Sequence, residues 1–199
     1  MRRWCGTVGS FFVALAVGAH PAARAQADLA PMPEAAMAGM ATAALSADGR
    51  LLLIAQADPP CLVVLDAQRG VPVHTLVPAA RDGRIATRIA ALHTAALRRS
   101  FIVAPADLAE LWEISYDPKA EDLYDGFVHD YPFGEGVPRR GYLGLRRTAL
   151  SEPLADFVLD EEEAEAWALA LPPPAGSGEG QVLNLDVRRR VATMSADRM

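Results

Sequence analysis

One arrangement occurs three times along this chain: an apolar strand that ends in an aspartate, followed by a turn and a second strand. The clearest copy is the stretch 61–76, in which the first strand ends at Asp66, the turn covers 67–70, and the second strand carries Val73 and Leu76. Short apolar runs joined by a turn that contains glycine are typical of a β-hairpin. The fold must therefore accommodate the same hairpin three times.

Each hairpin follows a further turn and strand, so the repeated unit is longer than the hairpin. In the first copy, Asp48 and Gly49 form the turn, 51–55 form the strand, and a loop is expected at 56–60. Asp-Gly supplies the positive backbone dihedral angles that tight hairpin turns need. The corresponding segments are 92–100, 101–104, 105–108 and 110–117 in the second copy, and 159–163, 166–171, 172–180, 181–186 and 187–194 in the third.

The spacing of the copies predicts a β-propeller. The strand-ending aspartates lie 51 residues apart between Asp66 and Asp117, and 69 apart between Asp117 and Asp186, whereas propeller blades repeat every ~40–50 residues. We attribute the excess in the second interval to an insertion at 127–152. Because one such unit cannot bury both of its faces, units stack about a shared axis, and closed propellers have about four to eight blades. The expected fold is all-β, a partial β-propeller of about three to four blades. The chain is then either a fragment of a longer ancestral protein, or blades from another copy complete it.

The N-terminal residues are expected to lie outside the propeller. A pair of arginines precedes an apolar run centred on 11–17, and a small-x-small site follows at 23–25. This is the pattern of a secretory signal peptide, and the paired arginines leave twin-arginine export open. The expected division is a signal peptide at 1–25, an N-terminal arm rich in Ala, Met and Pro at 26–43, and the partial propeller at 44–199.

Charge and cysteine content limit the partners. The formal net charge is −6, and removal of 1–25, which holds three arginines and no acid, takes it to −9. An acidic chain of this kind is not expected to bind nucleic acid. Cys5 leaves with the signal peptide, so Cys61 has no partner for an internal disulfide, and its place in an apolar strand indicates a small buried residue.

The residues best suited to ligand chemistry gather in the insertion. His129 lies beside an acid and close to Tyr131, and two arginine pairs follow at 139–140 and 146–147. Imidazole ligates iron or carries a proton, arginine pairs with carboxylates, and aromatic rings cover a flat ligand. These groups are suited to a porphyrin-like ligand. The competing interpretation is an exposed loop with its hydrogen bonds satisfied.

Other candidate sites carry less weight. His93, at the turn that enters the second copy, and His74, on a strand, are more typical of structural histidines. Cysteine and histidine show no metal-ligand spacing, and the chain contains neither a Gly-x-Ser-x-Gly elbow nor a Walker-type loop. The site is therefore expected in the segment around His129.

Three segments resemble the d1-heme propeller family, which includes cytochrome cd1 nitrite reductase and its NirF-type relatives in d1-heme biosynthesis: 110–118, 125–131 and 180–187. The sequence of these segments is nearer to that of the NirF type, and the similarity extends over about 45–194. The resemblance implies an eight-bladed periplasmic propeller that holds a tetrapyrrole at its axis, with histidines near the iron. His129 matches one family histidine and His93 lies near another. The chain has no Cys-x-x-Cys-His, so a c-type haem domain is not expected.

Two functions follow from this resemblance. In the first, a periplasmic NirF-like protein binds d1 heme or its tetrapyrrole precursor during cofactor maturation, as an enzyme or as a carrier, and works with nitrite reductase or other maturation proteins. His129 would be the metal ligand or proton-transfer group, and the further cofactor contacts would be His93, Tyr131, Arg139 and Arg140. The alternative is a non-catalytic or degenerate propeller fragment that acts as an interaction module, including one that pairs with a second copy. A generic stress-linked surface propeller is a third interpretation.

Overall fold

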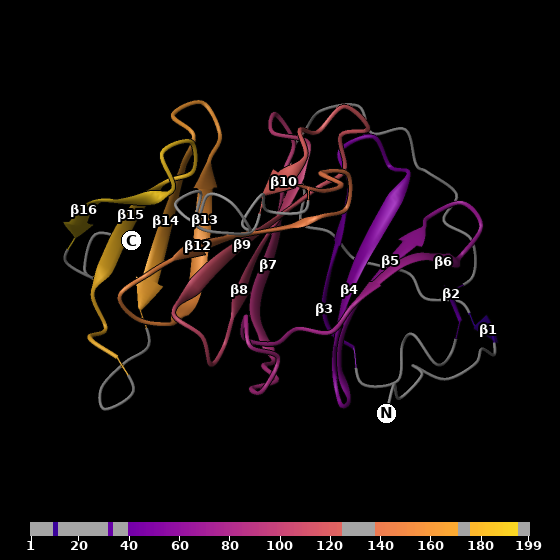
Figure 1. Ribbon diagram of the computed structural model, residues 1–199, viewed down its shortest axis with the longest axis horizontal. Coiled ribbons are helices and arrows are strands. Elements are labelled where there is room, and N and C mark those ends of the chain that lie inside the picture. Colours follow the sequence, from indigo (N-terminus) through magenta and orange to yellow (C-terminus); the bar gives the residue numbers. More distant parts are fainter. Residues whose placement is uncertain (1–9, 12–31, 34–39, 125–137, 171–175, 195–199) are drawn as a thin grey trace, which may run out of the picture.

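The computed structural model describes residues 10–11, 32–33, 40–124, 138–170 and 176–194. These residues form strands and turns, and none of them lies in a helix long and apolar enough to cross a membrane. Three four-stranded antiparallel sheets make up most of the structure (Figure 1), which confirms the expected all-β class. Two short strand pairs are added, β1 (Ser10–Phe11) with β2 (Met32–Pro33) and β10 (Leu123–Tyr124) with β11 (Pro138–Arg139).

The first sheet follows the chain in order and shows why each turn forms where it does. Its strands are β3 (Met40–Leu45), β4 (Leu51–Ala57), β5 (Pro60–Asp66) and β6 (Val71–Leu76). Gly49, in the turn after β3, has a φ of 70°, which glycine adopts without strain. At the end of β5, Asp66 Oδ1 accepts hydrogen bonds from the backbone N–H of Gln68 at 3.0 Å and of Arg69 at 2.9 Å. An aspartate therefore ends this strand because its side chain caps the turn.

The second and third sheets repeat this plan. The second consists of β7 (Ile89–Ala95), β8 (Ser100–Pro105), β9 (Glu110–Ser115) and β12 (Leu145–Ala149), and the third of β13 (Leu154–Asp160), β14 (Glu165–Ala170), β15 (Gly180–Asn184) and β16 (Arg189–Met194). In both sheets each strand pairs with the next one listed here, and the β10–β11 pair is inserted between β9 and β12.

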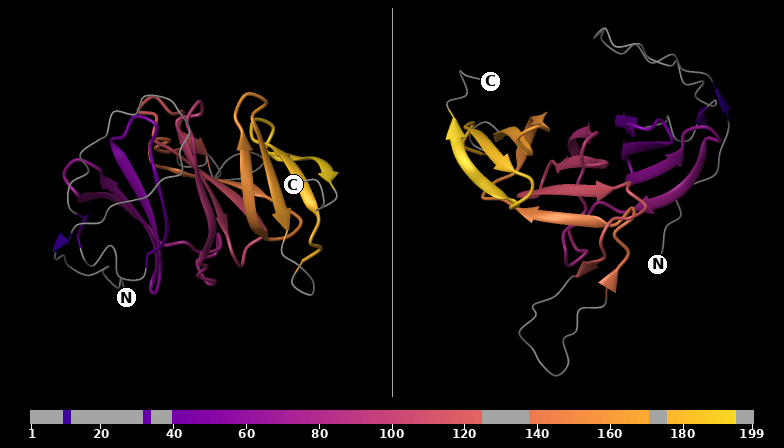
Figure 2. Two further views of the ribbon diagram at one scale, coloured as in Figure 1. Left: turned by 180° about the vertical axis from the view of Figure 1, so that it is seen from behind. Right: turned by 90° about the horizontal axis from the view of Figure 1, so that it is seen from above.

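The three sheets are arranged as a fan. Strands β3, β7 and β13, here called the inner strands, each form one edge of their sheet, and β7 packs against both β3 and β13. The right-hand view of Figure 2 shows the inner strands gathered on one side, while β6, β12 and β16 lie at the outer edges. Blades of a β-propeller are placed in this way about their axis.

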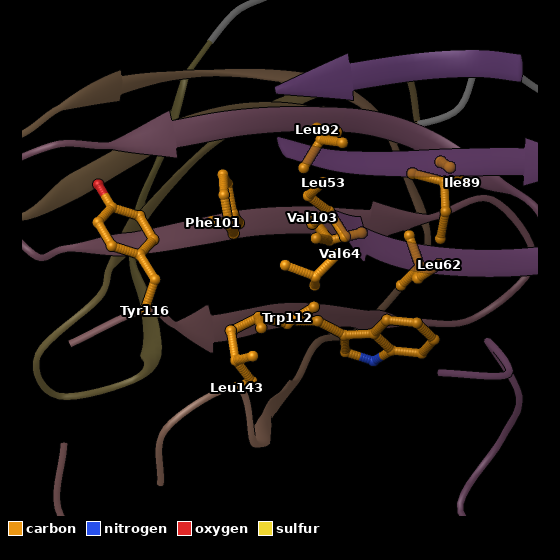
Figure 3. Close-up of a cluster of buried hydrophobic side chains, with 12 residues drawn as sticks. Leu53, Leu62, Val64, Ile89, Leu92, Phe101, Val103, Trp112, Tyr116 and Leu143 are labelled. Carbon is orange, nitrogen blue, oxygen red and sulfur yellow. The ribbon is translucent and has the colours of Figure 1, made fainter. Parts of the chain in front are cut away.

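An apolar layer joins the first sheet to the second (Figure 3). Leu53 and Val64 of the first sheet meet Phe101, Val103 and Trp112 of the second, and all five side chains are fully buried. Burial of such side chains contributes roughly 1.5–3 kcal/mol each. This layer is therefore a main source of stability for the two blades.

A second layer joins the second sheet to the third. It contains Ile102 and Ala104 of β8, together with Phe157, Ala168 and Leu183 of the third sheet. Successive residues of a strand point to opposite faces, so β8 sends Phe101 and Val103 to the first layer and the alternate residues to the second. The middle blade is thus buried on both faces, as the propeller arrangement requires.

The strand boundaries differ from the sequence-based expectation in several places. Strand β3 begins at Met40, so the end of the expected arm belongs to the first sheet. The loop expected at 56–60 is mostly strand, because β4 runs to Ala57 and β5 begins at Pro60. Strand β12 lies within the expected insertion at 127–152, so part of the extra length is the fourth strand of the second blade.

The placement of His93 at a turn was wrong, because His93 lies within β7. Strand β7 contacts the inner strands β3 and β13, one on each side. Apolar residues therefore occur on both of its faces, and its sequence lacks the alternation of apolar and polar residues that is typical of a half-exposed strand. A bulge between Ile89 and Ala91 interrupts the register further. The sequence of β7 therefore does not look like a strand.

Candidate functional site

Two inner strands bring a histidine of the second blade next to a carboxylate of the third. His93 lies on β7 and Asp156 on β13, and His93 Nε2 is 3.4 Å from Asp156 Oδ1. The two side chains are open to solvent, with exposed fractions of 46% and 70%. They form a hydrogen bond when Nε2 carries a proton. An imidazole and a carboxylate thus meet at the inner edge of the fan.

Phe157 supports this pair from the apolar layer below it. Its ring is fully buried, and the His93 ring meets it edge-on, with centroids 4.7 Å apart and an interplanar angle of 77°. Edge-to-face contact of this kind is favourable for aromatic rings. The His93 ring is therefore held by packing as well as by the carboxylate.

A histidine in this setting has two chemical uses. A neutral imidazole offers one lone pair, which accepts a proton or binds a metal ion, and a carboxylate on its other nitrogen orients it. Among the described residues, no three His, Cys, Asp or Glu side chains are grouped so as to hold a metal ion by themselves. The His93 imidazole is thus able to meet a ligand that carries a metal ion or a proton.

Arg139 and Arg140 are not brought together with His93. Arg139 lies on β11 and both arginines are exposed. The β10–β11 pair projects from the outer part of the second blade, on the side away from the inner strands (Figure 2). The Arg140 guanidinium lies over the Tyr142 ring, 5.7 Å from its centroid. A ligand at the inner edge would not reach these two arginines.

Arg146 and Arg147 belong to the framework, because they lie on β12 and pair with acids of the neighbouring β9. Arg147 Nη1 is 2.9 Å from Glu110 Oε2, and its Nη2 donates to the Ala79 carbonyl at 2.8 Å. The guanidinium also covers the Trp112 ring at 4.7 Å from the centroid. Arg147 therefore ties the outer edge of the second blade to the segment that enters it from the first.

Arg98 makes a similar link between the second and third blades. It pairs with Glu113 at 3.3 Å and with Asp186 of the third blade. Desolvation by burial acts to lower the pKa of Arg98, but the hydrogen bond to Asp186 and the charge of Glu113 outweigh it and raise that pKa. Arg98 and Glu113 line a cavity of about 450 Å³ together with Arg146. Because these charges already pair with one another, we assign the cavity to the framework.

The remaining sequence candidates fall into two groups. His129 and Tyr131 lie outside the described residues. His74 is half-buried on β6, an outer strand, and desolvation lowers its pKa. Cys61 is buried in β5, as expected. Neither of these last two residues takes part in the site at the inner edge.

Sequence reasoning did not find Asp156. It lies 63 residues from His93 in the chain and in no motif. Its place beside His93 results from the packing of β13 against β7. Only knowledge of the register between neighbouring blades would have identified it.

Comparison with known proteins shows which proteins parts of this chain resemble. Residues 34–128 match the model of the cytochrome D1 heme domain. Over 151 residues the chain is 31% identical to the dihydro-heme d1 dehydrogenase of Pseudomonas aeruginosa, an alignment that covers 76% of this chain and 25% of that protein. Over this part of its length the chain is similar to the cytochrome D1 heme domain and to this dehydrogenase.

Two solved structures are similar to the chain over a comparable length. The dihydro-heme d1 dehydrogenase NirN, determined in complex with DHE, superposes with a TM-score of 0.60 at 29% identity, over 78% of this chain and 28% of NirN. The hydrazine synthase of Kuenenia stuttgartiensis superposes with a TM-score of 0.52 at 11% identity, over 88% of this chain and 39% of the synthase, which is a likeness of fold alone. The chain thus spans about a quarter of the length of the d1-heme relatives that it matches. The predicted resemblance to d1-heme propellers is confirmed.

Proposed function

We propose that this chain is a periplasmic part of a d1-heme propeller that binds d1 heme or its tetrapyrrole precursor during cofactor maturation. The observation that carries the proposal is the exposed His93 on an inner strand, oriented by Asp156. Homology to a dihydro-heme d1 dehydrogenase supports the same ligand class. The specific NirF-type role stays a prediction of the sequence, since the relative that matches is a dehydrogenase.

The residues at the inner edge fit such a ligand. Histidine commonly ligates haem iron, and a bound d1 heme would supply the redox chemistry. The chain itself would bind the iron through the His93 imidazole and hold that ring in place. We propose that the chain binds and delivers the tetrapyrrole, a role for which a histidine held by Asp156 and Phe157 suffices.

The other predicted contacts enter the proposal differently. His129 and Tyr131 stay predictions, as a second histidine and an aromatic cover for the ring. Arg139 and Arg140 lie at the outer edge of the second blade, so their pairing with propionates requires a ligand position other than beside His93. Separate variants that replace His129 and Tyr131, or Arg139 and Arg140, distinguish these ligand positions from the one beside His93.

The experiment is a visible titration of the purified chain with d1 heme, with ferric protoporphyrin as a second probe. We expect a shifted Soret band, and an affinity that falls at least about tenfold, or 1.4 kcal/mol, in His93→Ala. His74→Ala is the matched control, because it removes a histidine from an outer strand and should leave the titration unchanged. A wild-type chain that causes no spectral shift contradicts the proposal.

One observation favours the alternative function, an interaction module. On the face of the third sheet that points away from the second, an apolar row crosses all four strands in register: Val158, Trp167, Val182 and Ala192. Val158 is 67% exposed and Trp167 is 38% exposed. The equivalent face of the second blade is covered by the third blade. We propose that a blade from a second copy of this chain covers the row.

Size-exclusion chromatography with light scattering, which gives the mass of the protein in solution, tests this second function. The expected mass is twice that of the monomer, and Trp167→Glu should reduce it to that of the monomer without changing the Soret titration. A wild-type chain that is monomeric at every concentration excludes pairing through this face.

A further inference from the structure

We propose that Asp156 is a positioning residue for His93. By accepting a hydrogen bond from Nε2, it holds the tautomer in which the lone pair lies on Nδ1, and makes Nδ1 the nitrogen that meets the ligand. The identity of that ligand rests on the proposed function, whereas the tautomer is a property of the chain alone.

The Asp156 carboxylate is held by its own strand as well as by the imidazole. Asp156 Oδ1, the oxygen 3.4 Å from His93 Nε2, also accepts the backbone N–H of Phe157 at 2.8 Å. One oxygen therefore faces both donors. Because a carboxylate at neutral pH only accepts hydrogen bonds, it selects the imidazole tautomer with the proton on Nε2.

The ring is also held by packing. The His93 ring meets the buried Phe157 ring edge-on at 4.7 Å, so one strand of the third blade contacts the imidazole through two adjacent residues. A ring flip would break the Nε2 contact without removing the aromatic one. Within the described residues His93 Nδ1 has no hydrogen-bond partner, and it is the nitrogen left available.

The geometry around His93 therefore depends on how the second and third blades pack against each other. His93 belongs to the second blade, and both of its positioning contacts belong to the third. In metal-binding histidines, loss of such a carboxylate typically costs 10–100-fold in metal affinity. We therefore expect Asp156 to influence ligand binding without touching the ligand.

The test is long-range proton–nitrogen NMR of the ligand-free chain with labelled histidine, at a pH at which imidazole is neutral. The wild type should show His93 with Nε2 protonated. Asp156→Ala should move the Nδ1 resonance toward its protonated position as the two tautomers mix, and Asp156→Asn, whose amide oxygen still accepts, should restore the wild-type shifts. Asp160→Asn, on the same strand, is the control.

The same variants are then titrated with d1 heme. We expect Asp156→Ala to weaken binding by 10–100-fold, and Asp156→Asn to recover most of the affinity. If Asp156→Ala leaves both the nitrogen shifts and the affinity unchanged, the positioning role is overturned. If the nitrogen shifts change as expected but the wild type does not bind d1 heme, the positioning role stands and the proposed function fails.

Discussion

Replacement of Leu183 by alanine tests whether the third sheet packs on the second as a propeller blade. Leu183 lies on β15, is 1% exposed, and belongs to the apolar layer with Ile102 and Phe157. The substitution removes about three buried methylene equivalents at ~0.8 kcal/mol each, or about 2.5 kcal/mol of transfer free energy. The cavity adds to this cost, and measured Leu→Ala values in protein cores reach about 5 kcal/mol. We expect the free energy of unfolding to fall by about 3–4 kcal/mol.

The assay is urea denaturation followed by tryptophan fluorescence and by far-ultraviolet circular dichroism. Leu97→Ala is the matched control, since Leu97 is 72% exposed in the turn between β7 and β8, and an exposed substitution usually changes stability by less than about 0.5 kcal/mol. If the two variants lose the same stability, Leu183 does not lie between two packed blades and the reasoning is refuted.

Two further predictions concern side chains outside the inner edge. Arg147→Met should lower the free energy of unfolding by about 2 kcal/mol, because it leaves Glu110 without its cation and removes the hydrogen bond to the Ala79 carbonyl. An additional Glu110→Gln change should restore part of the lost stability. An unchanged urea midpoint in the single variant would argue against this link. Desolvation lowers the pKa of His74 below 6.5 in the folded chain, so the unfolded chain takes up the proton first and stability falls as the pH drops below about 6.5. Urea midpoints at pH 7.5 and 5.5 should therefore differ less in His74→Gln than in the wild type, and equal differences would show that His74 has no part in the pH dependence.

The blades could be predicted from the sequence because local chemistry marks their turns. Asp48-Gly49 and Asp66 place the first two turns correctly, since glycine supplies the positive φ and the aspartate caps the backbone. Strand β12 could not be recognised in the same way. Its arginines are typical of an exposed loop, and only their pairing with Glu110 and Glu113 on β9 shows that they belong to a sheet.

The site was predicted less completely than the fold. The sequence marked His93 through the family resemblance but placed it in a turn. In the structure His93 lies on β7, an inner strand that packs against the inner strands of both neighbouring blades. Asp156 carried no signal, because its contact with His93 depends on how two blades pack. Residues that meet across blades in this way are determined by tertiary packing and leave no spacing pattern in the chain.

The most direct test of the central claim is pulsed electron paramagnetic resonance of the ferric d1 heme complex, prepared with nitrogen-labelled histidine. We predict a hyperfine coupling between the iron and a histidine nitrogen that disappears in His93→Ala and persists in His74→Ala. A coupling that is unchanged in His93→Ala, or absent from the wild-type complex, would contradict the assignment of His93 as the residue that meets the tetrapyrrole.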